Sequence, residues 1–147
     1  MEPDVNARLR GVVNRLARQF NASATHEGLT PTQASVLGLI AFAQSISITD
    51  IAAQERLNPT MVSRVVSRLD ELGLIVRQQS PADLRVAVVS LTPLGRETHE
   101  RVKEQKGRVI ADGLEQLDEH DRQSILAALP ALETLSGRLT KPQPPAL

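Results

Sequence analysis

The sequence predicts a mainly α-helical protein that carries one small β-hairpin. Three observations lead to this fold class. Apolar residues recur every three or four positions over much of the 147 residues, which is the spacing of a buried helix face. Between Thr49 and Leu72 two such stretches are short and close together, and after Leu74 the spacing changes to the two-residue period of a strand. Two short helices followed by a two-stranded ribbon form a winged helix-turn-helix.

The second helix of this motif has clear predicted ends. It begins at Asn58-Pro59, because an Asn side chain can accept a first-turn amide and proline has no amide to lose. It ends before Gly73, a residue type that suits a left-handed cap. Its inward stripe is Val62, Val65, Leu69 and Leu72. Its outward face is polar and basic, with Thr60, Ser63, Arg64, Ser67 and Arg68. Hydroxyl and guanidinium groups bond phosphates and base edges, so this face and Asn58 are the predicted double-stranded DNA surface.

The predicted ribbon has its tip at residues 80–85, where Asp83 stands two residues before Arg85. A carboxylate at this spacing can hold the guanidinium extended, and an extended arginine at a wing tip is placed to enter a minor groove. The simpler alternative is a surface ion pair in an ordinary turn, which contributes little to stability. We assign Asp83 and Arg85 to the candidate DNA site.

One motif connects the wing to the next helix. Asp83 and Arg85 fit D-x-R, the following residues Leu91, Thr92 and Gly95 fit L-T-x-x-G, and the run SRVVSRLDELGLI precedes both. In these residues the chain resembles the MarR family of bacterial transcriptional regulators, and the resemblance in helix order extends to about Arg138. It implies a homodimeric repressor of a palindromic promoter site, released by a small ligand that binds between the helical region and the winged lobe.

The domain prediction treats residues 1–140 as one domain. Residues 30–92 form the DNA-binding lobe, and residues 5–29 and 93–139 form a helical dimerisation region. These flanking helices carry more apolar surface than one small core can cover, and a dimer interface accounts for the excess. Residues 141–147 contain three prolines and are predicted to be a disordered tail.

Local patterns add finer expectations. The first helix ends near Asn21, and residues 21–29 form a loop. Capping side chains predict helix starts at Thr30, Thr49, Thr92 and Asp118. Pro130 is expected to kink or divide the last helix. Apolar groups nearly surround the helix after Pro31, namely Val36, Leu37, Leu39, Ile40 and Phe42. The helix after Thr92 is predicted to turn Val102, Val109, Ile110, Leu114 and Leu117 inward, and to pair Glu97 with Arg101 and Glu104 with Arg108.

Composition limits the function further. With 17 basic and 17 acidic residues the formal charge is zero, so DNA affinity must come from local placement of charge. The absence of cysteine excludes thiol catalysis and thiol-based sensing. The three histidines are scattered, and no phosphate loop or nucleophile elbow is present, so we expect no enzyme activity, metal or cofactor. No apolar run approaches the ~20 residues of a membrane span, which makes the cytoplasm the default location.

Two features of the sequence each allow a second interpretation. Arg15 and Arg18 lie three apart on the first helix and could meet a small aromatic or anionic effector, although solvated arginines are the simpler interpretation. A winged helix can also act as a protein-interaction module without direct DNA readout. The outward Ser63, Arg64 and Arg85 favour DNA, because a protein-binding face should instead expose an apolar patch.

Overall fold

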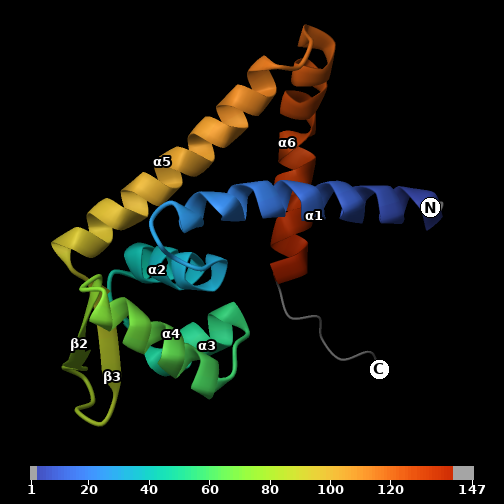
Figure 1. Cartoon of the computed structure of the whole chain (residues 1–147). Helices are drawn as coiled ribbons and strands as arrows, with labels where there is room; N and C mark the ends of the chain where they lie inside the picture. The colour runs from blue at the N-terminus through green and yellow to red at the C-terminus, as the bar shows by residue number, and fades with distance from the viewer. Residues whose placement is uncertain (1–2, 141–147) are drawn as a thin grey trace, which may run out of the picture. The chain divides into compact units, whose positions relative to one another are not determined.

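The computed structural model describes residues 3–140 and confirms a mainly helical fold with a small antiparallel sheet (Figure 1). The predicted tail at 141–147 lies outside the described residues. The elements in chain order are α1 (Pro3–Thr25), α2 (Pro31–Ala43), β1 (Ile46–Ser47), α3 (Ile48–Glu55), α4 (Pro59–Glu71), β2 (Ile75–Gln79), β3 (Ala87–Leu91), α5 (Pro93–Glu115) and α6 (Glu119–Thr140). One compact unit ends at Val109 within α5, and a second begins at Ile110.

The core of the first unit lies where α2, α3 and α4 meet the sheet. Strand β3 is central, with β1 and β2 antiparallel on either side, and Ile75 pairs with Leu91 while Arg77 pairs with Val89. The largest fully buried side chains among the described residues are Val36, Leu37, Ile40, Ile51, Val62, Val66, Leu69, Ile75 and Val89. The sequence stripe of α4 missed Val66, which lies beside Val62 and Leu69 on the buried face. This packing fixes how α4 presents its opposite face.

Capping side chains set the helix starts, mostly as predicted. Thr30 and Gln33 form a reciprocal capping box at α2, and Asn58 Oδ1 accepts from the Met61 amide at 2.8 Å at α4. Asp118 Oδ1 accepts from the Asp121 amide at 2.8 Å at α6. The prediction that Thr49 caps α3 is wrong. Ser47 is the cap, because β1 ends there in extended geometry and its hydroxyl accepts from the Asp50 amide at 3.0 Å.

The start of α5 is locked to the corner between α4 and β2. Thr92 donates its hydroxyl proton to the Gly73 carbonyl at 2.6 Å, and the Thr92 amide donates to the Leu74 carbonyl at 3.0 Å. The same hydroxyl oxygen accepts from the Gly95 amide at 3.0 Å, which caps α5. A Cβ at position 95 would lie 2.0 Å from the Leu74 carbonyl oxygen, so only glycine permits this close approach. The L-T-x-x-G pattern therefore has a structural cause.

Helices α1 and α6 are longer without a break than the sequence predicted. Helix α1 continues past Asn21 to Thr25, because this stretch contains neither glycine nor proline; the turn comes at Gly28, whose φ of 71° is left-handed. Helix α6 runs on through Pro130, so the expected division of this helix is wrong; proline there leaves the helix one backbone donor short.

Some predicted inward positions and one ion pair also differ. Phe42 is 89% exposed, because it follows buried Ile40 by two residues and so points away from the core. Val109 and Ile110 are 40% and 44% exposed, whereas Val102 is buried as predicted. Arg101 pairs with Glu27 rather than Glu97, since its Nε lies 3.1 Å from both oxygens of that half-buried carboxylate. The predicted pair of Glu104 and Arg108 is present.

Candidate nucleic-acid interface

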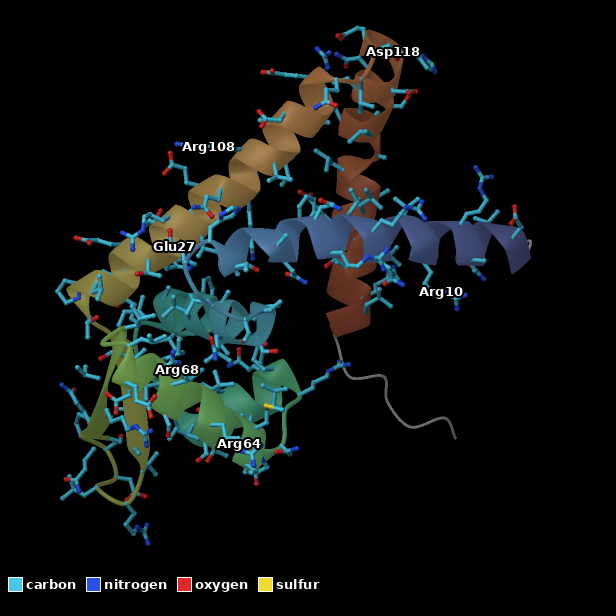
Figure 2. All side chains as sticks on the ribbon, viewed as in Figure 1. Arg10, Glu27, Arg64, Arg68, Arg108 and Asp118 are labelled. Carbon is cyan, nitrogen blue, oxygen red and sulfur yellow. The ribbon has the colours of Figure 1, made fainter. Side chains whose placement is uncertain are left out.

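The outward face of α4 forms a shallow open groove. Its lining is Thr60, Ser63, Arg64, Ser67, Arg68 and Glu71, so five of the predicted DNA-binding residues lie together. Figure 2 shows Arg64 and Arg68 on this helix. Arg68 donates to Glu71 at 3.3 Å. Glu71 was not among the residues predicted for the outward face of α4. A groove lined by hydroxyls and guanidinium groups offers donors to phosphate oxygens and to acceptor atoms on base edges.

Asn58 lies at the N-terminal end of this groove-bearing helix. Its side-chain oxygen accepts from the Met61 amide, and its amide nitrogen is left to donate to a ligand. The positive end of the helix dipole favours an anion near this end of α4. Asn58 therefore acts first as a cap and is an auxiliary candidate for DNA contact.

Arg77 of β2 contacts the polar face of α4, although it was not among the predicted site residues. Its Nη2 donates to Ser67 Oγ at 2.9 Å, and its Nε lies 3.6 Å from Asp70 Oδ2. The two-residue period of β2 could have identified this contact, because Arg77 shares its face of the strand with buried Ile75. That face is the one turned toward α4.

The wing, defined as β2, β3 and the connecting residues 80–86, ends in a hydrogen-bonded turn. The Ser80 amide donates to the Val86 carbonyl at 2.8 Å, and the Val86 amide donates to the Asp83 carbonyl at 3.0 Å. Figure 1 shows this turn at the end of the ribbon that points away from α5. The turn therefore presents its side chains at the far end of the ribbon.

The predicted ion pair between Asp83 and Arg85 is present at this tip. Arg85 donates through Nε and Nη2 to the two carboxylate oxygens, both at 3.1 Å, and its side chain is 89% exposed. These side-chain bonds, followed by the bond from the Arg85 amide, hold the pKa of Asp83 below its usual value. The carboxylate is thus ionised at neutral pH and restrains an arginine that is otherwise surrounded by solvent.

Two further cavities of the first unit have walls from α5. One, of about 240 Å³, is lined by Ile40, Ala41, Gln44, Leu91, Arg96, His99 and Glu100 from α2, β3 and α5. The other lies between α1 and α5 and is lined by Gln19, Ala22, His26, Gln105, Arg108 and Val109. Arg15 and Arg18 are exposed on α1 and line neither cavity. Among the described residues of one chain, both arginines therefore lie on the exposed surface of α1.

His99 in the first cavity gives the fold a predicted pH dependence. Its ring packs on Gly38, and burial lowers its pKa; Lys103 and Lys106 act in the same direction and Glu100 opposes them. The unfolded chain then binds more protons than the folded one between the lowered pKa and the ordinary value of about 6.5. We expect stability to fall as pH drops through this window and His99→Gln to flatten the dependence. Thermal unfolding between pH 7.5 and 5.5 checks this; an unchanged slope would contradict it.

No group of three or more acidic or histidine side chains is placed to hold a metal ion within the part of the chain that the structure describes. None of the described helices combines the length and apolar content that a bilayer crossing requires.

Comparisons with known proteins agree with this geometry. A family model described as the MarR family matches residues 29–87. A proposed transcriptional regulatory protein for the hcr operon of Thauera aromatica is 31% identical over 116 residues, covering 78% of this chain and 70% of that protein. The HTH-type transcriptional repressor MdtR of Bacillus subtilis is 27% identical over 118 residues, covering 80% and 76% respectively. A Staphylococcus aureus MepR mutant bound to an oligodeoxyribonucleotide aligns with a TM-score of 0.69 at 20% identity, covering 88% and 96%.

The fold and the polar face of α4 define a winged helix-turn-helix regulator of transcription. The chain belongs to the MarR family of DNA-binding regulators. The relatives are regulators of transcription rather than enzymes.

Proposed function

We propose that the protein is a homodimeric repressor that binds a palindromic promoter site and is released by a small-molecule ligand. The observation that carries the proposal is the groove on α4, where Arg64 lies among hydroxyl groups, together with the exposed Arg85 at the wing tip. One element suits a major groove and the other a minor groove. The repressor role is supported by the similarity to MdtR, and DNA contact by the similarity to MepR.

The dimer is supported by apolar surface that one chain leaves exposed. On α1 the exposed side chains are Val5, Leu9, Val12, Val13 and Leu16, at 41–53%. On α6 they are Ile125, Leu126, Leu129, Leu132, Leu135 and Leu139. Apolar stripes of this length in a soluble chain favour burial against a second copy. Residues 5–29 and 93–139 would then be the dimerisation region, residues 30–92 the DNA-binding lobe, and the two recognition helices would lie about 34 Å apart.

The effector is proposed as a small aromatic or anionic molecule. The cavity formed by α2, β3 and α5 supports this, because it combines apolar Ile40 and Leu91 with Arg96 and His99. A ligand there would touch both the winged lobe and α5, so its binding could change the spacing of two recognition helices. Arg15 and Arg18 remain candidates for an anionic ligand only if a second copy encloses them.

The DNA mechanism is tested by separating Arg64 from Arg85. Arg64→Ala should cost roughly 1–3 kcal/mol on the best site and relax preference at one position of each half-site, because a forked bond to a base edge is lost. Arg85→Ala should weaken many sequences together and make the salt dependence shallower, because a charge near phosphates is lost. Asp83→Ala should resemble a milder Arg85→Ala. The measurement is equilibrium binding to a randomised duplex panel at two salt concentrations.

His120→Ala supplies the control, since this exposed side chain lies on α6, outside the winged lobe. Unchanged affinity for Arg64→Ala and Arg85→Ala alike would remove the proposed mechanism and favour the protein-interaction alternative. Sequencing the duplexes that the wild-type protein selects also shows whether the site is palindromic.

A further inference from the structure

We propose that Arg77 is a positioning residue that fixes the hydroxyl group of Ser67 as a hydrogen-bond donor toward an acceptor atom on DNA. The inference rests on the proposed function, because it assumes that the α4 groove faces the duplex. It goes beyond that function by assigning a polarity to one contact and a role to a strand residue outside the groove lining.

The Arg77 guanidinium reaches from β2 to α4 and donates from Nη2 to Ser67 Oγ at 2.9 Å. A second contact holds it there, since its Nε lies 3.6 Å from Asp70 Oδ2, one helical turn beyond Ser67. Arg77 pairs with buried Val89 across the sheet, so the strand cannot rotate to carry its side chain elsewhere. The guanidinium is therefore restrained by backbone register and by two side chains of α4.

A guanidinium group has only donors, whereas a serine hydroxyl has one proton to donate and two lone pairs that accept. The bond from Arg77 therefore uses a lone pair of Ser67 Oγ and leaves the hydroxyl proton to point away from the guanidinium. A bond from a charged donor also polarises the hydroxyl and makes its proton a better donor.

The hydroxyl proton of Ser67 has no acceptor within the described part of the chain. Helical hydroxyl groups commonly donate to the carbonyl four residues before, as Ser124 does to His120 and Thr134 does to Pro130, both at 2.9 Å. Ser67 makes no such bond among the described residues, although it is also helical; its only bond there is the one it accepts from Arg77. Ser67 lines the groove on α4, so the proton is available to a ligand in that groove.

The partner that fits is an acceptor on a duplex. Guanine N7 and O6, adenine N7 and thymine O4 accept in the major groove, and phosphate oxygens accept along its edge, whereas the cytosine amino group only donates. Arg77 also places a positive charge against Asp70, which reduces the repulsion between that carboxylate and nearby phosphates. Ser67 should therefore favour acceptors, and it should do so only while Arg77 holds it.

The test is a double-mutant cycle of Ser67→Ala and Arg77→Ala, measured by equilibrium binding to a duplex selected by the wild-type protein. Each single variant should lose roughly threefold to tenfold in affinity, the effect of one hydrogen bond. The double variant should lose no more than Arg77→Ala alone, because Arg77 acts through Ser67. Arg77→Lys should restore part of the loss, since an ammonium group can also donate to Ser67 Oγ. Gln78→Ala is the matched control, because its side chain lies on the other face of β2.

Urea unfolding separates positioning from a structural role. All variants should unfold near the wild-type midpoint, because exposed pairs contribute little to stability. Loss of preference at one base position in Ser67→Ala would identify a base edge as the acceptor, and a uniform loss would identify a phosphate; both support the donor role. The donor role would be overturned if the affinity losses of the two single variants multiplied in the double variant. It would also be overturned if the free energy of unfolding fell by as much as the free energy of binding. If Ser67→Ala and Arg77→Ala had no effect on affinity while Arg64→Ala weakened binding, this inference would be wrong. If Arg64→Ala were without effect as well, the proposed function would have failed instead.

Discussion

Gly95→Ala is expected to lower the free energy of unfolding by at least about 3 kcal/mol, the upper end for a forced overlap in a packed site. The added Cβ would lie 2.0 Å from the Leu74 carbonyl oxygen. That carbonyl cannot move away cheaply, because it accepts the Thr92 amide and because Leu74 is buried. The corner between α4, β2 and α5 would have to open, and the wing would lose its fixed position.

The control for this substitution lies in the same helix. A Cβ at Gly107 would meet no atom within 4 Å, so Gly107→Ala should instead stabilise the helix by about 0.5–1 kcal/mol. Urea unfolding of both variants at one protein concentration measures the two effects with opposite sign. Equal effects of the two substitutions would show that helix propensity, and not the overlap with Leu74, decides the outcome at position 95.

The parts of this fold that were predictable from sequence depend on contacts local in the chain. The caps at Thr30 and Asn58 each need only a side chain and an amide three residues away, and both are present. The Asp83–Arg85 pair spans two residues and was also predictable. The predicted cap of α3 was wrong because Ser47 and Thr49 both suit a cap. Only the pairing of β1 with β3, which joins distant segments, decides between them.

The parts that were not predictable depend on contacts between distant segments. Glu27 and Arg101 lie 74 residues apart, so the local spacing favoured Glu97 instead. The contact from Arg77 to Ser67 needs both the strand register and the rotation of α4, and neither is fixed by one segment alone. Val109 was predicted to be inward, but it is exposed in the single chain. Apolar spacing indicates that a side chain favours burial, and it does not indicate whether the same chain or a second copy covers that side chain.

Leu9→Asp combined with Leu16→Asp is expected to convert the protein to a monomer and to weaken binding to a palindromic duplex by ~100- to 10,000-fold, because the second half-site no longer adds avidity. The two leucines are 41% and 48% exposed on the same stripe of α1, and charged carboxylates there would oppose burial against a second copy. Binding to a single half-site should change little, because α4 and the wing are untouched. Light scattering reports the mass, and titration of full and half sites reports the affinity.

Phe42→Asp is the control, since Phe42 is 89% exposed but lies on α2, outside the proposed interface. A protein that stays dimeric after the α1 changes would place the interface elsewhere, and dissociation by Phe42→Asp would place it on the winged lobe.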